Sequence, residues 1–319
     1  MHPLLQALLS AWEWRIETTV LLLTMGTLYT VGWRRLRSRS NNPKLATKRK
    51  LVAYLSGLAT LAIAFMSPVD PLGGQLLFMH MVQHKLVIMI AAPLLWLANP
   101  FPFSMWGLPI GLRKRIGALF TQDAGFRRFL KKITNPGIAW LAFITLYMGW
   151  HDPNAYNLAL RNSFVHDLEH ISFFAAAMLF WWHIVGAAPH IHGNVSPWAR
   201  LAMLIGVIPP TMIAGIVIAT APNVIYTYYE TVPRIWGFTA LQDQAIGGVI
   251  MWIPSSEMIV WGVVFLLAGA FKKEDQGLPH PVPNWDDDEK MVAPGLEHRA
   301  RQNKWRKLAE ARAHAATIQ

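Results

Sequence analysis

Long apolar stretches separated by short polar connections constrain the fold of this chain more than any other feature. Of the 319 residues, 53% are hydrophobic and 15% are charged, whereas soluble domains carry about a quarter charged residues. A helix needs about 20 apolar residues to cross a bilayer. The sequence therefore predicts an all-α membrane protein, with a bundle of seven transmembrane helices within residues 1–271. The predicted spans are 16–33, 51–68, 75–98, 136–151, 166–186, 200–220 and 244–270.

Lys and Arg residues are distributed unevenly among the connections. They are dense after the first, third and seventh stretches, whereas the connections of the other side hold only Arg15, Arg161 and Arg234. Because cytoplasmic loops carry the excess of basic residues, we expect an outer N-terminus and a cytoplasmic C-terminus. Residues 1–14 contain no Lys or Arg, so we expect the first stretch to be retained rather than cleaved as a signal. The net charge of +11 follows from this asymmetry and does not require a nucleic-acid partner.

Residues 272–319 form a separate polar tail that we expect to be cytoplasmic. The tail contains several prolines and a short acidic run before a segment, 296–315, that is rich in Ala, Arg and Lys. This composition favours a helix. The helix is either solvated, or it lies on anionic lipid or on a partner protein.

Two histidine pairs are the strongest functional signal. His80 and His84 are four residues apart, as are His166 and His170, and this spacing places both rings of a pair on one helix face. The predicted topology brings both pairs, together with His151 at the end of the fourth stretch, to the outer side. Histidine is the commonest metal-ligating side chain. These five histidines are therefore the predicted ligands of a metal or haem site, and the alternative is a hydrogen-bonded cluster that holds helices together.

The absence of cysteine narrows the chemistry of such a site. A soft metal such as Cu(I) would have only Met and His side chains as ligands. Met79, Met81 and Asp243 are weaker candidates for ligands. Four further polar residues are expected to orient the ligands or to stabilise the fold: Asp70, Asp167, Glu169 and Gln244.

Two charged residues are predicted near the middle of the bilayer. Lys85 lies about ten residues into the third stretch, and Glu257 lies about thirteen residues into the seventh, so both are near the midplane at a rise of 1.5 Å per residue. An isolated charge at this depth costs at least ~2.5–3.5 kcal/mol. We therefore predict that Lys85 and Glu257 form a pair; the alternative is that Lys85 extends its ammonium group to the membrane surface or loses its proton.

Four sequence segments resemble the membrane assembly factors of caa3-type cytochrome c oxidase, the CtaG-like proteins. The segments are 79–84 (MHMVQH) followed by 91–95 (AAPLL), 162–170 (NSFVHDLEH), 179–182 (LFWW) and 243–254 (DQAIGGVIMWIP). The resemblance covers about residues 50–270, and it departs from the expected pattern at Lys85, where an apolar residue is expected. It implies a multi-pass protein of the bacterial cell membrane that acts on cytochrome c oxidase subunits at the copper stage and is not an enzyme.

Two other functions remain open from the sequence. The histidine pairs could supply axial ligands to haem, in which case the protein would be a haem-binding membrane protein. The protein could also transport copper or a small solute, with Lys85 and Glu257 as a gating pair.

Overall fold

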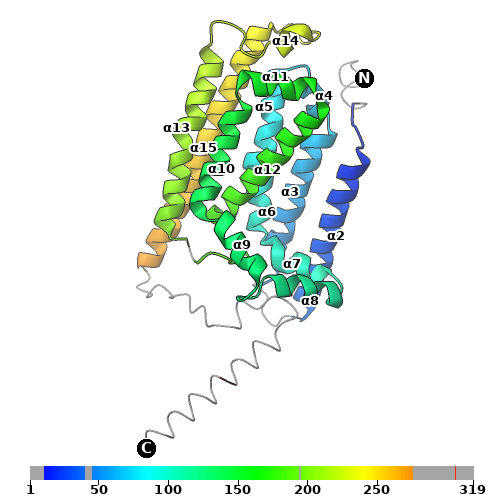
Figure 1. Ribbon diagram of the computed structural model, residues 1–319, viewed down its shortest axis with the longest axis vertical. Helices are drawn as coiled ribbons and strands as arrows, with labels where there is room; N and C mark the ends of the chain where they lie inside the picture. Colours follow the sequence, from blue (N-terminus) through cyan, green and yellow to red (C-terminus); the bar gives the residue numbers. More distant parts are fainter. Residues whose placement is uncertain (1–10, 40–44, 194, 276–305, 307–319) are drawn as a thin grey trace, which may run out of the picture.

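The computed structural model describes residues 11–39, 45–193, 195–275 and 306. The side chains of residues 254–259, 261 and 265–275 are outside this description. In the described residues every regular element is a helix (Figure 1). The predicted tail helix at 296–315 lies outside the described residues, apart from Arg306. The longer helices are α2 (Ile16–Arg39), α3 (Lys48–Met66), α10 (Pro136–Trp150), α12 (Ser163–Val185), α13 (Pro197–Thr220) and α15 (Ala240–Asp275).

A further long helical stretch is assembled from three consecutive segments. These are α5 (Leu77–Lys85), the π-helical segment η1 (Leu86–Ala91) and α6 (Ala92–Leu97). The shorter helices are α4 (Val69–Gly73), α7 (Pro100–Gly107), α8 (Ile110–Leu119), α9 (Gly125–Ile133), α11 (Pro153–Arg161) and α14 (Tyr228–Thr231). In Figure 1, α4, α11 and α14 lie at one end of the long helices, and α7, α8 and α9 lie at the other.

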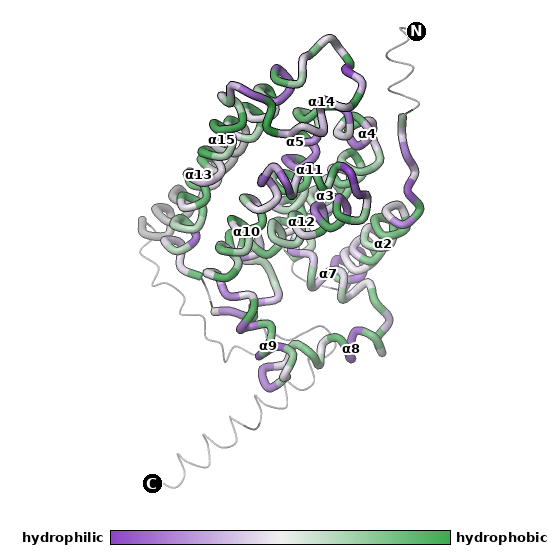
Figure 2. Tube along the Cα trace, turned by 45° about the horizontal axis from the view of Figure 1, so that its top comes forward, coloured by the Kyte–Doolittle hydropathy of each residue, from purple (hydrophilic) through white to green (hydrophobic). Residues whose placement is uncertain are grey.

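Four of the described helical stretches are long and apolar enough to cross a membrane: Lys48–Met66, Leu77–Leu97, Ser163–Val185 and Pro197–Thr220. Pro136–Trp150 is a shorter apolar helix. Helices α2, α10 and α15 run alongside these four stretches (Figure 1). The hydropathy colouring in Figure 2 is mostly apolar along the long helices, while polar residues are frequent in α8, α9 and α11. The predicted all-helical membrane protein is therefore confirmed at this level.

Side-chain caps define where several helices begin. Asn135 accepts a hydrogen bond from the backbone N–H of Ile138, and Ser196 accepts one from Ala199. Asn162 accepts hydrogen bonds from the backbone N–H groups of Phe164 and Val165. These contacts satisfy N–H groups that have no partner within the helix. Because Asn162 caps α12, the helix begins at Ser163, and His166 and His170 lie within the first two turns of α12.

The closest packing of two long helices is between α13 and α15, where glycine is required. A Cβ atom on Gly215 would lie 2.8 Å from the Cβ of Trp252, and one on Gly248 would lie within 3 Å of the backbone of Ala219. Small residues at such positions allow two membrane helices to approach closely. The resulting contact fixes α15 in the bundle, and the N-terminal end of α15 supplies a contact to the candidate site.

The π-helical segment lies next to that site and has a specific cause. In a π-helix each N–H bonds the carbonyl five residues earlier, and Ala92 bonds Val87 in this way. The next bond is absent because Pro93 has no N–H to donate to Ile88. The indole Nε1 of Trp181 on α12 donates to the Ile88 carbonyl instead, at 2.9 Å. A side chain of α12 thus satisfies the backbone group that proline leaves free.

Candidate metal centre

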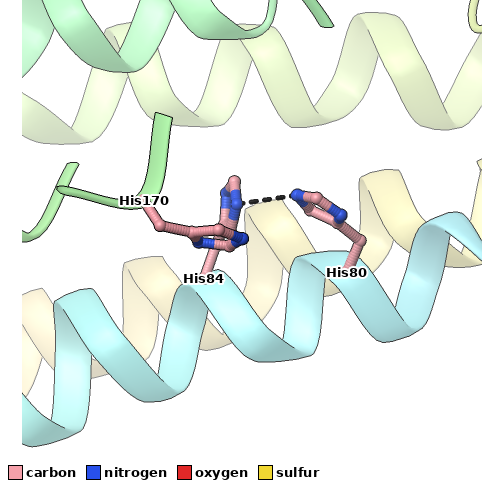
Figure 3. Close-up of side chains that lie close together, drawn as sticks. All are labelled: His80, His84 and His170. Atoms are coloured by element: carbon pink, nitrogen blue, oxygen red, sulfur yellow. Dashed lines mark hydrogen bonds between the residues drawn. The ribbon is translucent and has the colours of Figure 1, made fainter. Parts of the chain in front are cut away.

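Helices α5 and α12 bring the two histidine pairs together. The Nε2 atoms of His80 and His84 are 2.8 Å apart, and those of His166 and His170 are 3.1 Å apart. The ring centre of His80 is 5.4 Å from that of His166 and 5.5 Å from that of His170. Figure 3 shows the rings of His80, His84 and His170 turned toward one another. The pairs that the sequence singles out therefore form one cluster.

Glu169 is part of this cluster, although the sequence indicated only a supporting role for it. Its side chain is fully buried, and its Oε1 lies 3.7 Å from His84 Nε2 and 3.9 Å from His80 Nε2. The signal that could have found it is its spacing from His166. Residues three apart share a helix face, so Glu169 projects toward the same side of α12 as both histidines.

Several buried polar atoms of the cluster have no hydrogen-bond partner within the described part of the chain. They are the Nδ1 atoms of His80 and His84 and both carboxyl oxygens of Glu169. A buried polar group without a partner costs about 1–3 kcal/mol. Native proteins seldom leave such groups together. The cluster therefore has the character of a binding site rather than of a polar contact between helices.

The distances within the cluster fit the ligands of a metal ion. One ligand atom each from His80, His84 and His170 can be chosen so that all lie within 4.8 Å of one another, and the same holds for His80, His166 and Glu169. Two nitrogens bound at about 2.0–2.1 Å in tetrahedral geometry lie about 3.3–3.4 Å apart. Small movements of the observed imidazoles would reach this arrangement. Imidazole with carboxylate suits zinc, copper or iron.

His151 lies beside the cluster and belongs to neither donor group. It follows the last residue of α10, and its Nδ1 donates to the carbonyl of Tyr147 at 2.6 Å. Its ring centre is 6.4 Å from that of His84. This local hydrogen bond orients the ring, and the structure does not bring His151 into the group that the sequence predicted.

Asp243 and Gln244 support the backbone instead of joining the donor groups. The carboxylate of Asp243 accepts hydrogen bonds from the N–H groups of Leu77 and Phe78 at 2.9 and 3.0 Å, and it pairs with Arg234 at 2.9 Å. Asp243 therefore caps the N-terminus of α5 from α15. Gln244 accepts a hydrogen bond from the N–H of Ile225.

The two methionines near the first histidine pair differ in their environment. Met81 is buried in the apolar core, whereas Met79 is half-buried. Their role as weaker ligands stays a prediction.

Asp70 and Asp167 lie around the rim of the centre and share one partner. Arg15 pairs with Asp70 at 3.2 Å and approaches Asp167 at 3.8 Å. Asp70 also accepts a hydrogen bond from Gln83 of α5 at 2.6 Å. Burial raises the pKa of Asp70, while Gln83 and Arg15 act in the opposite direction. These contacts connect the residue before α2 with α4 and α5 near the histidines, and the supporting role of Asp70 stays a prediction.

The predicted pair of Lys85 and Glu257 cannot be assigned, because the side chain of Glu257 lies outside the described residues. Lys85 is buried on α5 directly after His84. Its Nζ lies 5.4 Å from the ring centre of Tyr147, a cation–π distance. The pairing of Lys85 with Glu257 therefore stays a prediction.

The comparison with protein families matches most of the chain. The family described as cytochrome c oxidase caa3 assembly factor (Caa3_CtaG) matches residues 27–273. This chain belongs to that family. The match contains α5 and α12 in full, so the histidine cluster lies within the part of the chain that matches the family.

Relatives of this chain occur in mycobacteria. An uncharacterized protein of Mycobacterium bovis is 26% identical over 294 residues, which cover 86% of this chain and 42% of the relative. An uncharacterized protein of Mycobacterium leprae is 25% identical over 268 residues, which cover 80% of this chain and 39% of the relative. The chain thus spans about two fifths of the length of these relatives. No solved structure matches it.

The histidine cluster borders an open cavity. This cavity has a volume of about 440 Å³ and lies among α2, α3 and α12. His170 lines it together with Arg15, Asp167 and mainly apolar side chains that include Leu21 and Phe65. The buried imidazoles are therefore next to a space that opens to the surroundings of the protein.

Proposed function

We propose that this caa3 assembly factor holds copper during the assembly of cytochrome c oxidase, and that the four-histidine cluster with Glu169 is the copper site. The observation that carries the proposal is the set of buried, converging donors that have no other partner in the described residues. Copper accepts imidazole ligands, and the name of the family assigns its members to the assembly of a cytochrome c oxidase. Copper is the cargo in this proposal.

The residues of the cluster have distinct tasks in such a site. His80, His84 and His170 are buried and would provide nitrogen ligands at one point, while the half-buried His166 would be the least buried of the four. Glu169 contributes a negative charge that offsets part of the charge of the ion, which would otherwise be costly in a buried site. Transfer to the oxidase requires only that the ligands release the ion one after another. This non-catalytic role agrees with a protein that is not an enzyme.

We also infer that the chain crosses the bacterial cell membrane seven times, through α2, α3, the α5–α6 stretch, α10, α12, α13 and α15. The excess of Lys and Arg in the connections supports a cytoplasmic position for α8 and α9. The histidine cluster then lies toward the outer side, in the half of the molecule that contains α4, α11 and α14 (Figure 1). Subunits of cytochrome c oxidase would receive copper there.

The test compares His84→Ala and His170→Ala with His190→Ala, a histidine that is exposed on the segment after α12. Loss of a ligand should lower copper(I) affinity about 10–100-fold or more, and should lower cytochrome c oxidase activity in membranes, while protein levels stay normal. His190→Ala should change neither property. Full copper binding in both cluster variants would contradict the proposal, and disappearance of both proteins would favour a purely structural cluster.

Absorption spectra and metal analysis of the same purified protein separate the alternatives. A Soret band that is lost in His84→Ala would show that the cluster binds haem instead of copper. Copper uptake into proteoliposomes that depends on Lys85 would favour a transporter. Bound copper without either result supports the assembly role.

A further inference from the structure

The end of the molecule opposite the histidine cluster has an amphipathic helix with a strongly basic face. Helix α9 contains Arg127, Arg128, Lys131 and Lys132 and no acidic residue, and none of its residues is buried. Phe126, Phe129 and Ile133 are exposed on it. At 100° per residue these three fall within one narrow arc, and the four basic residues occupy the opposite side. This pattern is typical of a helix that lies in the membrane interface.

A cavity adjoins the basic face of α9. It has a volume of about 360 Å³ and is lined by Gln122, Arg127, Arg128, Lys131, Ile191 and Gly193. This volume is within the range of about 300–1,000 Å³ that is usual for ligand sites. Its lining contains three cationic residues and no acidic residue. The cavity therefore favours an anionic ligand.

The cavity is held in shape by contacts between two separate parts of the chain. One guanidinium nitrogen of Arg127 donates to the Phe120 carbonyl at 2.9 Å, and another donates to the His190 carbonyl at 3.1 Å. Thr134, just after α9, binds the ring of His192 through its hydroxyl at 2.9 Å. These contacts connect α9 to the segment after α12. The side chains of Arg128 and Lys131 are exposed and make no hydrogen bond within the described part of the chain.

We propose that this cavity binds the phosphate-containing headgroup of an anionic phospholipid. The exposed arc of Phe126, Phe129 and Ile133 would enter the acyl region of the adjacent leaflet, and this arc favours a lipid over a free phosphate ion. Arg128 and Lys131 contact the phosphate, while Arg127 keeps α9 in place. The lipid would join α9 to the end of α12, the helix that carries His166 and His170. The proposal does not depend on the identity of the metal.

The test uses the full chain in neutral detergent and measures its affinity for phosphatidylglycerol and for phosphatidylcholine. The test variant is Arg128→Gln/Lys131→Gln, and the matched control is Lys114→Gln/Arg115→Gln on α8, which removes the same charge away from the cavity. A basic residue beside an anionic headgroup contributes about 1 kcal/mol, or about fivefold in affinity, so the test variant should bind phosphatidylglycerol about 25-fold more weakly. The control should bind nearly as well as the unaltered protein.

Three results would overturn the proposal. Equal losses in the test and control variants would indicate diffuse attraction to a charged surface instead of a site. Equal affinity for phosphatidylcholine would remove the requirement for an anionic headgroup. Competition by inorganic phosphate or glycerol phosphate at concentrations similar to that of the lipid would identify a free anion as the ligand. A Phe126→Ser/Phe129→Ser variant provides the complementary result, since it should weaken lipid binding without changing the binding of soluble phosphate.

Discussion

At the residue scale, the candidate centre is distinguished by how few of its buried polar atoms are engaged elsewhere in the described structure. His151 and Asp243 show the contrast. Each is polar and near the cluster, but His151 is bonded to the Tyr147 carbonyl and Asp243 to two backbone N–H groups and Arg234. Glu169 has neither oxygen bonded. The candidate ligands thus differ from their polar neighbours in having buried polar atoms without a hydrogen-bond partner.

Replacing Glu169 by Gln should have opposite effects on the two forms of the protein. Without metal, the neutral amide should raise the thermal stability, because it removes a buried carboxyl group that has no hydrogen-bond partner and can donate to an imidazole. Copper affinity should fall about 10–100-fold. Thermal unfolding with and without copper(I) measures both effects. Glu230→Gln, at an exposed position on α14, is the control, and a lower stability of the metal-free Glu169→Gln variant would contradict this account.

How much of the centre the sequence predicts depends on whether the decisive contact is local. The four-residue spacing identifies both histidine pairs, because that spacing is a property of one helix. The partner of Asp243 is 166 residues away along the chain, so no pattern near Asp243 reveals that it caps α5. The role of His151 depends on the exact end of α10. The spacing therefore predicts the two histidine pairs, whereas the hydrogen bonds of His151 and Asp243 are seen only in the structure, and the ligand roles predicted for these two residues stay predictions.

At the scale of helices, the starts predicted from apolar content lie within about one turn of the observed helix starts. The fourth stretch was predicted at 136–151 and is found as Pro136–Trp150. The fifth was predicted to begin at residue 166, but α12 begins at Ser163, because Asn162 caps it. The π-helical segment within the third stretch consists of apolar residues, so hydropathy does not distinguish it from an apolar α-helix. Its cause is a proline together with a tryptophan donor from another helix, which sequence periodicity does not show.

That tryptophan donor makes a prediction for the third stretch. Trp181→Phe keeps an aromatic side chain but replaces the indole, whose N–H group satisfies the Ile88 carbonyl, with a smaller ring that has no donor. The buried Ile88 carbonyl would then have no donor, because Pro93 has no N–H group. The variant should therefore lose about 1–3 kcal/mol of stability. Denaturation in mixed detergent micelles measures the loss. Trp198→Phe, at an exposed position on α13, should have little effect, and equal losses in the two variants would show that the hydrogen bond is unimportant.

The cavity between α2 and α12 makes a second prediction at this scale. Because His170 lines this cavity, we expect copper to reach the cluster through it. Leu21→Trp would fill the cavity from α2, and should slow copper(I) uptake severalfold without changing the final stoichiometry. Leu23→Trp, on the same helix but outside the cavity lining, is the matched control. Stopped-flow measurement with a copper(I) indicator gives the rates, and identical rates for the two variants would place the entrance elsewhere.

At the scale of the whole molecule, the two ends of the bundle have different chemistry. The histidine cluster lies toward the end with α4, α11 and α14, and the basic helices α8 and α9 lie at the other end (Figure 1). The described structure has four helical stretches that are long and apolar enough to span a membrane, and the basic connections predict which end faces the cytoplasm. Hydropathy alone could not show that the cluster is formed by helices separated by about 80 residues in the chain.

A reporter protein fused at defined positions tests this arrangement. A fusion after residue 275 should report the cytoplasm, and fusions near residues 155 and 230 should report the outer compartment, because the Lys- and Arg-rich connections remain inside. An enzyme that is active only outside the cytoplasm, paired with a fluorescent protein that is active only inside, gives both signals. An outer position for residue 275 would place the histidine cluster on the cytoplasmic side and would change the source of its copper.

The cap that Asp243 places on α5 determines when the centre can be completed during synthesis. The histidines of α5 and α12 leave the ribosome well before residue 243. Until α15 is made, the first N–H groups of α5 lack the carboxylate that holds them in the finished structure. A chain interrupted before α15 would have every ligand but not the support that positions His80 and His84. Under the proposed copper role, the site would therefore mature only after α15 is made, so unfinished copies would not sequester copper from the oxidase.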